Sequence, residues 1–84
     1  MYTIKIRSKA LRQLEKLPRD MQERITNKLT YYSQTDNPLF FAERLTHFSL
    51  GQYRYRVGDY RIIFDLVEQV ILVIAIGHRS EIYK

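Results

Sequence analysis

The sequence predicts an α+β fold in which a pair of helices covers one face of a largely antiparallel, twisted sheet. Three observations lead to this prediction: an alternating segment at the N-terminus, two stretches with apolar residues at helical spacing, and a long C-terminal stretch of β-forming residues broken by turns. The predicted order of elements is β-α-α-β-β-β. No linker, repeat or low-complexity tract divides the chain, so residues 1–84 are expected to form a single domain around one modest core.

The N-terminal half supplies the first strand and both helices. Tyr2, Ile4 and Ile6 alternate with polar residues, which predicts a half-buried strand. Ser8 is expected to cap a short helix whose apolar side carries Leu11, Leu14 and Leu17. Pro18 ends that helix and suits the first turn of the next. The second helix has a single apolar stripe, formed by Met21, Ile25, Leu29 and Tyr32.

The C-terminal half is strand-like after a break at Asn37-Pro38. The segment 39–49 is ambiguous, and its apolar residues could cover an edge of the core; they are Leu39, Phe40, Phe41 and Leu45. Gly58-Asp59 predicts a two-residue hairpin loop, and a leading glycine suits a type II′ turn. A second turn is expected near Glu68-Gln69.

The register of the predicted hairpin follows from its loop. Val57 faces Tyr60, Arg56 faces Arg61 and Arg54 faces Ile63. Because side chains alternate along a strand, one face collects apolar residues that suit the floor beneath the helices: Tyr53, Tyr55, Val57, Tyr60, Ile62, Phe64 and Leu66. The opposite face collects Arg54, Arg56, Arg61, Ile63 and Asp65.

Three arginines on one face of a hairpin are hard to explain by stability. Like charges directly opposite across strands destabilise a sheet, and Arg56 against Arg61 is such a pair. Guanidinium groups grip phosphate in a bidentate way, which points to a polyanionic ligand. The alternative is a solvated face whose arginines pair with Asp59 or Asp65.

The last strand, Val70 to Ile76, is almost continuously apolar, as expected of a strand covered on both sides. Running antiparallel to residues 60–66, it brings His78 and Arg79 into the neighbourhood of Arg61. The expected cluster therefore holds several cations, one imidazole and the phenol of Tyr83.

Composition narrows the partner and excludes several kinds of site. A net charge of +5 and a pI near 9.7 favour RNA, DNA or an acidic protein, although many small domains are mildly basic without binding nucleic acid. The chain has no cysteine, and His47 and His78 are too far apart for a zinc motif, so no metal and no cofactor is expected. His47 is expected to lie in a loop without a role. No apolar run is long enough to cross a bilayer and no signal peptide is evident, so a cytoplasmic protein is expected.

Two segments resemble a known family of toxins. Residues 51–64, GQYRYRVGDYRIIF, resemble the central hairpin of the RelE/ParE toxin superfamily, and residues 76–83, IGHRSEIY, resemble the C-terminal signature of its RelE branch. The resemblance covers essentially the whole chain and implies a toxin that cleaves messenger RNA in the A site of the 30S ribosomal subunit. It also implies a cognate RelB-like antitoxin, acidic in its toxin-binding segment. The alternatives are ParE-like inhibition of DNA gyrase and a noncatalytic basic nucleic-acid-binding domain.

The resemblance also implies roles for individual residues. Arg54 and Arg56 occupy positions where RelE-like toxins often carry lysines. Arg61 matches a phosphate-binding arginine of the hairpin, Arg79 matches the arginine after the last strand, and Tyr83 matches the terminal tyrosine. Arginine is effectively never deprotonated, so Arg54 and Arg56 can stabilise a phosphorane but cannot act as bases. Tyr83 is the preferred base or orienting group, and His78 is a possible acid. For His78, a strand-end histidine bonded to its own backbone is the competing interpretation.

Overall fold

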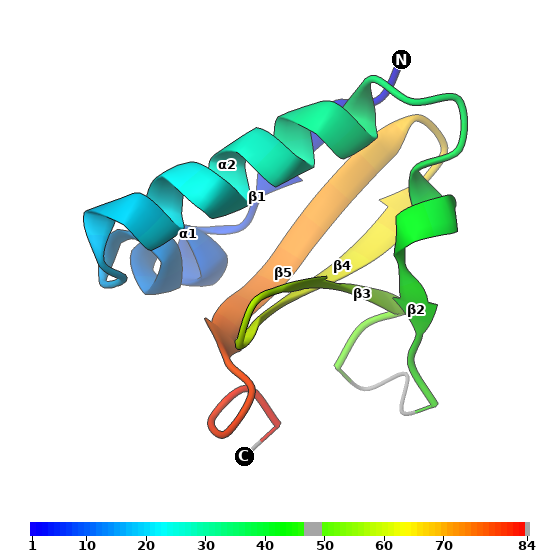
Figure 1. Ribbon diagram of the computed structural model, residues 1–84. Helices are drawn as coiled ribbons and strands as arrows, with labels where there is room; N and C mark the ends of the chain where they lie inside the picture. Colours follow the sequence, from blue (N-terminus) through cyan, green and yellow to red (C-terminus); the bar gives the residue numbers. More distant parts are fainter. Residues whose placement is uncertain (47–49, 84) are drawn as a thin grey trace.

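In the computed structural model, which describes residues 1–46 and 50–83, two α-helices lie across one face of a five-stranded sheet (Figure 1). The strands stand side by side in the order β1-β5-β4-β3-β2; β1 runs parallel to β5 and the other neighbours are antiparallel. The elements are β1 (Thr3–Ile6), α1 (Ser8–Glu15), α2 (Arg19–Ser33), the 3-10 turn η1 (Pro38–Phe41), β2 (Glu43–Arg44), β3 (Tyr53–Val57), β4 (Tyr60–Val67) and β5 (Val70–His78). This confirms the predicted α+β class and adds one short strand, β2, that was not predicted. His47 lies outside the described residues.

The main core fills the space between the helices and the sheet. Its helical side comes from Ala10, Leu14, Ile25, Leu29 and Tyr32, and its sheet side from Tyr55, Val57, Ile62, Phe64, Ile71, Val73 and Ile76. Both predicted stripes therefore face the sheet, with Ala10 in place of Leu11, which is 43% exposed. The predicted cap at Ser8 is wrong: Ser8 is the first helical residue, Arg7 precedes it, and no side chain caps the helix.

The hairpin of β3 and β4 has the predicted register, with Val57 opposite Tyr60, Arg56 opposite Arg61 and Arg54 opposite Ile63. Gly58 has a φ of +60° and Asp59 a negative φ, as a type II′ turn requires. The second turn also lies where it was predicted, since Glu68 and Gln69 join β4 to β5.

A β-bulge interrupts the pairing of β4 with β5. Ile63 pairs with Ala75 and Phe64 with Val73, so Ile74 is an extra residue on β5. Beyond the bulge, Arg61 lies opposite Gly77 and Tyr60 opposite His78. Because the side-chain period of a strand is two, this single extra residue decides which face each later side chain occupies.

Two short pieces of chain cover the sheet face away from the helices: the passage at Gly51 and the turn that follows β5. Ile63 is only 1% exposed there, because the chain at Gly51 passes so close that a Cβ on Gly51 would lie 2.6 Å from the Ile63 side chain. Two hydrogen bonds hold this passage in place: Gln52 N donates to Asp65 Oδ1 (2.8 Å), and Leu66 N donates to Gln52 Oε1 (3.0 Å). In the ambiguous segment, Leu45 is buried, whereas Phe40 is 79% exposed.

Candidate functional site

The sheet face away from the helices carries a pair of arginines joined by one carboxylate. Arg54 and Arg56 alternate on β3, and Glu43 enters from β2, where it lies opposite Arg54. Its Oε1 is 2.6 Å from Arg56 Nε and its Oε2 is 3.3 Å from Arg54 Nη2. The hydrogen bond from Arg54, and then the charges of the nearby arginines, hold the pKa of Glu43 below its ordinary value of 4.5. Glu43 is therefore a carboxylate at neutral pH and occupies the place where the two guanidiniums would bind an anion.

Tyr83 meets the same arginine from the C-terminal end of the chain. Arg54 Nη1 donates a hydrogen bond of 2.6 Å to Tyr83 Oη, and the guanidinium carbon lies 5.8 Å from the centre of the phenol ring. This bond is the leading cause that raises the pKa of Arg54, whose side chain is only 23% exposed. Arg54 Nε is buried without a hydrogen-bond partner in the described part of the chain. Arg54 is thus the centre of the site, with a carboxylate on one side and a phenol on the other.

The turn that follows β5 places Tyr83 beside Arg54. Glu81 N and Ile82 N both donate to the carbonyl oxygen of His78, which folds residues 79–83 back toward the sheet. The Ile82 side chain rests over Gly77, where an added Cβ would lie 3.1 Å from Ile82 Cδ1. A glycine at this position therefore leaves room for the apolar contact that precedes Tyr83.

Arg61 lies at the hairpin end of the same face, and Arg79 follows β5 beside the hairpin loop. Arg61 Nη1 donates to the carbonyl oxygens of Gly58 (3.0 Å) and Tyr60 (3.1 Å), so its guanidinium is folded back onto the hairpin. Its charge nevertheless contributes to the lowered pKa of Glu43. Arg79 is tied to the hairpin loop by a backbone hydrogen bond to the Asp59 carbonyl (2.8 Å) and an exposed ion pair with the Asp59 carboxylate (3.6 Å).

His78 lies on the other face of the sheet. It is directly opposite Tyr60, which packs against the main core, and the two rings meet edge to face with centroids 5.4 Å apart. Its Nδ1 accepts a hydrogen bond of 3.1 Å from the Ser80 backbone N–H and lies 2.8 Å from Ser80 Oγ. The backbone of His78 is near the arginines as predicted, but its ring is not. The geometry favours the interpretation of a strand-end histidine bonded to the local backbone.

Glu43 is the member of the site that sequence reasoning missed. The alternative interpretation paired the hairpin arginines with Asp59 or Asp65, yet Asp59 pairs with Arg79 and Asp65 accepts a hydrogen bond from the Gln52 backbone. One sequence signal was available, because Glu43 is the only acidic residue between Pro38 and Gly51. A two-residue strand has no alternation to detect, so the pairing of Glu43 with β3 left no pattern in the sequence.

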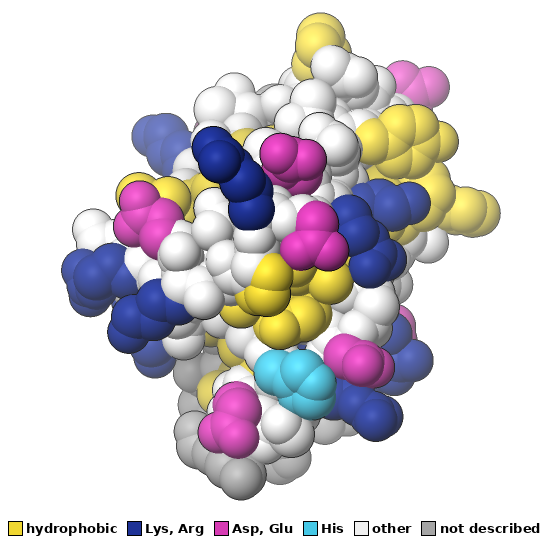
Figure 2. All heavy atoms as spheres, turned by 60° about the vertical axis from the view of Figure 1, so that its left-hand side comes forward, with side chains coloured by type: hydrophobic (Ala, Val, Ile, Leu, Met, Phe, Trp, Pro, Cys, Tyr) yellow, Lys and Arg dark blue, Asp and Glu magenta, His cyan; other side chains and the backbone are white. Residues whose placement is uncertain are grey.

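On the face that Figure 2 draws, the cations are not gathered in one continuous patch. In Figure 2 the lysine and arginine side chains of the visible face alternate with carboxylates. Within residues 1–46 and 50–83, no group of three or more His, Cys, Asp or Glu side chains could hold a metal ion. In the same ranges, no helix is both long and apolar enough to cross a membrane. The arrangement of charges at Arg54 and Arg56 is thus a local feature of β3 and its neighbours.

Sequence comparison assigns the chain to a family. Residues 4–83 match the model of the ParE toxin of the type II toxin–antitoxin system parDE. No curated protein sequence matches the chain significantly. Since the matched region is nearly the whole chain, the chain belongs to this toxin family.

Structural comparison finds the same fold in RelE toxins. The structure is similar to a chain of the toxin–antitoxin complex RelBE2 from Mycobacterium tuberculosis (TM-score 0.75, 22% identity, covering 93% of this chain and 98% of that one). It is similar to a chain of the archaeal RelE–RelB complex from Pyrococcus horikoshii OT3 (TM-score 0.75, 25% identity, covering 95% of this chain and 97% of that one). It is also similar to the isolated E. coli RelE toxin (TM-score 0.74, 24% identity, covering 99% of this chain and 92% of that one).

Fold and family together define a toxin of a type II toxin–antitoxin system. Its fold is also that of the solved RelE toxins. Complexes of RelE with RelB among the similar structures support a cognate antitoxin as its partner.

Proposed function

We propose that this toxin is a ribosome-dependent endoribonuclease that cleaves messenger RNA in the A site. The observation that carries the proposal is the meeting of two guanidiniums, a carboxylate and a phenol hydroxyl on one face of the sheet. Arg54 and Arg56 of β3 both contact the Glu43 carboxylate, and Tyr83 of the C-terminal turn accepts a hydrogen bond from Arg54. Such a set can bind a phosphodiester and stabilise the charge that develops on it.

The chemistry is attack of a ribose 2′-hydroxyl on the adjacent phosphate. The 2′-oxygen forms a bond to phosphorus and the bond to the 5′-oxygen breaks, leaving a 2′,3′-cyclic phosphate and a 5′-hydroxyl. In this proposal the phosphate replaces the Glu43 carboxylate between Arg54 and Arg56. Arg61, released from the hairpin carbonyls, and Arg79 supply further positive charge for the pentacoordinate phosphorane. The reaction as proposed draws on no metal or cofactor.

Two groups of the site can receive the proton of the 2′-hydroxyl. Tyr83 is preferred as base, which requires its phenolate form, or as orienting group, because Arg54 fixes the position of its oxygen. Glu43 is the second, since its lowered pKa leaves it deprotonated at neutral pH and phosphate binding would free it from the arginines. The role of His78 as the acid for the leaving oxygen stays a prediction, and its hydrogen bond to Ser80 argues against it.

The partners follow from this proposal. A site with abundant cations and no strong dedicated base depends on ribosomal groups to complete it, so we place its action on the 30S A site in the cytoplasm. Inhibition by a RelB-like antitoxin follows if an acidic segment covers or displaces the C-terminal turn that carries Tyr83.

A second candidate is ParE-like inhibition of DNA gyrase, and the family model that matches residues 4–83 favours it. The arginine–tyrosine arrangement favours RNA cleavage instead, because a phenol held 2.6 Å from a guanidinium suits the binding and activation of a phosphodiester.

The experiment that separates the two is mapping of transcript 5′ ends after induction, with gyrase supercoiling measured in parallel. Cuts within codons of translated messages, with the same naked RNA largely intact, are the expected result. Gyrase inhibition with unbroken transcripts would select the second candidate. In single-turnover cleavage of ribosome-bound message, Arg61→Ala should be strongly impaired. Near-normal cleavage by both Arg61→Ala and Tyr83→Phe would contradict the proposal that these residues form the active site.

A further inference from the structure

The C-terminal turn that carries Tyr83 is anchored to His78, the last residue of β5. Three successive backbone N–H groups of the turn donate to this residue. Ser80 N donates to the ring nitrogen Nδ1 (3.1 Å), and Glu81 N and Ile82 N each donate to the backbone carbonyl oxygen (2.9 Å). The imidazole therefore supplies the acceptor for the first of these bonds, and the peptide carbonyl supplies the acceptor for the other two.

The bond from Ser80 fixes the form of the imidazole. A ring nitrogen that accepts an N–H carries no hydrogen, so the hydrogen of the neutral ring lies on Nε2. The Ser80 hydroxyl oxygen lies 2.8 Å from the same Nδ1 and, beside this tautomer, acts as a donor. The imidazolium form, which acts most readily as a general acid, has a hydrogen on both nitrogens and would lose the bond from Ser80 N. Anchoring the turn and donating a proton therefore require different forms of the ring.

The direction of the ring is held from the strand side by Tyr60. His78 of β5 lies directly opposite Tyr60 of β4, and the two rings meet edge to face, with centroids 5.4 Å apart and planes at 86°. Tyr60 in turn packs against the main core. A flip of the imidazole would exchange Nδ1 for a carbon and remove the acceptor. The ring therefore presents Nδ1 to the turn from a position that the sheet determines.

The turn transmits this anchor to the arginine face. Beyond its three bonds to His78, the side chain of Ile82 rests over Gly77, and the hydroxyl of Tyr83 accepts the 2.6 Å hydrogen bond from Arg54. Tyr83 itself is 40% exposed, so packing restrains its side chain only in part. The place of its hydroxyl therefore depends on the backbone path of the turn, which begins at the bond between Ser80 N and the imidazole.

We propose that His78 is a positioning residue, whose Nδ1 orders the turn at Ser80 and thereby sets Tyr83 against Arg54. The imidazole does this from the face of the sheet opposite to the arginines and contacts no substrate. The expected effect on rate rests on the cleavage function proposed above. The effect on the turn does not depend on that function.

Asparagine and glutamine at position 78 separate the acceptor from the other properties of the ring. In His78→Asn the amide Oδ1 takes the place of Nδ1 and accepts an N–H two residues further on, as in an Asx turn. In His78→Gln the amide lies one methylene further out, near the place of Nε2. Both variants lose the imidazole as an acid and its contact with Tyr60. A difference between them therefore reports the acceptor alone.

The rate of cleavage should distinguish the two variants. In single-turnover cleavage of ribosome-bound message, His78→Gln should lower the maximal rate about 10- to 100-fold, and His78→Asn should remain within about threefold of the unchanged protein. The toxin concentration that gives half the maximal rate should change less than about twofold in both, because neither variant removes a phosphate-binding arginine. Rescue by asparagine is expected of a positioning residue and not of an acid.

The turn itself is measured by NMR on the full chain without ribosomes. Hydrogen exchange at the Ser80 amide should be at least about tenfold faster in His78→Gln than in His78→Asn. Contact between the Tyr83 ring and the Arg54 side chain, seen as a nuclear Overhauser effect, should persist in His78→Asn and disappear in His78→Gln. Melting temperatures of the two variants should agree within about 2 °C, because both lose the same ring from the end of β5.

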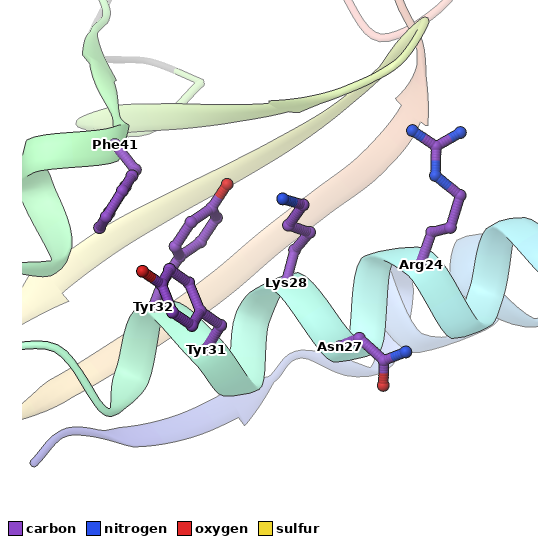
Figure 3. A pocket seen from close by; sticks show the side chains of 6 residues that line it. All are labelled: Arg24, Asn27, Lys28, Tyr31, Tyr32 and Phe41. Carbon is purple, nitrogen blue, oxygen red and sulfur yellow. The ribbon is translucent and has the colours of Figure 1, made fainter.

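The matched control is Asn27→Gln, which lengthens an amide side chain in the same way on α2. Asn27 is exposed and is one of the residues that line a groove along this helix, and Figure 3 shows it projecting from α2 away from the strands. The bonds that hold the turn come from β5 and from the turn itself. Asn27→Gln should therefore change the cleavage rate less than about twofold and leave exchange at the Ser80 amide unchanged.

Three outcomes would overturn the proposal. The first is an equal, large loss of cleavage in His78→Asn and His78→Gln, as expected if the imidazole acts as the acid. The second is a Tyr83–Arg54 contact that persists in both variants. The third is a melting temperature more than about 5 °C lower in His78→Gln than in His78→Asn, which would make the acceptor a support of the whole fold. If the unchanged protein cleaves no message, the proposed nuclease is refuted, and the NMR comparison still decides whether His78 positions Tyr83.

Discussion

The two faces of the sheet are closed in different ways. The face under the helices is sealed by apolar side chains from α1, α2 and three central strands, and its buried members are almost all aliphatic or aromatic. The opposite face is closed by the passage at Gly51, which covers Ile63, and by the C-terminal turn, whose Ile82 rests over Gly77. Stability therefore resides mainly in one face, and the other presents the arginines and Tyr83. This division implies that substitutions on the two faces have separable effects.

The largest effect should be on the free energy of unfolding, after removal of a large buried side chain from the helix-covered face. Phe64 is fully buried on β4 and its ring stacks on Tyr55 with centroids 4.3 Å apart. Phe64→Ala should lower the free energy of unfolding by about 3–5 kcal/mol, because it removes buried apolar surface and leaves a cavity. Urea unfolding followed by circular dichroism measures this. On the other face, Arg56→Ala should shift the same free energy by less than about 1 kcal/mol. Similar losses for both variants would contradict the division between the faces.

The helix-covered face is also the one that the sequence predicts well. The alternation from Tyr53 to Leu66 and the Gly58-Asp59 loop determine the hairpin register without any other information, since a slip of one residue would expose the apolar set. The stripe of α2 follows in the same way from its spacing of three and four. The prediction that Ser8 caps the first helix failed, because Ser8 is itself the first helical residue and Arg7 before it is extended.

The next largest effect should come from removing a single hydroxyl group on the arginine face. Tyr83→Phe keeps the ring over the Arg54 guanidinium and deletes the oxygen that accepts its hydrogen bond. Loss of one hydrogen bond made in the transition state costs about 10²–10³ in rate, so single-turnover cleavage of ribosome-bound message should fall by that factor. Tyr31→Phe is the matched control, because Tyr31 is exposed on α2 and its hydroxyl has no place in the proposed mechanism. Near-normal cleavage by Tyr83→Phe would leave stacking as the remaining role of Tyr83.

A smaller effect is expected one residue away, where Ile82 anchors the C-terminal turn. Ile82→Ala removes the contact over Gly77 and should loosen Tyr83 without touching substrate. Misplacing a catalytic group costs about 10- to 100-fold, so cleavage should fall within that range while the melting temperature changes little. The decisive readout is the double variant with Tyr83→Phe. If Ile82 acts only through the Tyr83 hydroxyl, Ile82→Ala should cause no further loss in that background. Additive losses would show a separate role.

The arginine face was only partly predictable, for two physical reasons. The face that His78 occupies depends on the bulge at Ile74: if Ile74 paired regularly with Ile63, Tyr60 would lie opposite Gly77 and the imidazole would point toward the arginines. Alternation in the sequence carries no mark of such a bulge. Glu43 was missed because its strand is too short to show a pattern, although it contacts residues 11 and 13 positions away. The arginines themselves were placed correctly, since their positions follow from the hairpin register alone.

The smallest effect concerns the ion pairs of Glu43 and depends on pH. The pKa of Glu43 is lower in the folded protein than its ordinary value of 4.5, mainly because of the hydrogen bond from Arg54. A lowered folded pKa means that the stabilisation is complete above the ordinary value and is lost as pH falls through the lowered one. Glu43 is about half exposed, so the contribution should be less than about 1 kcal/mol. Urea unfolding at pH 7 and at pH 3 should therefore show Glu43→Gln slightly less stable than the unchanged protein at pH 7, with the difference narrowing at pH 3. A difference that widens on acidification would show that Glu43 does not stabilise the fold through its charge. A Glu43→Gln protein that is more stable at pH 7 would indicate that desolvation of the carboxylate outweighs its pairing with the arginines.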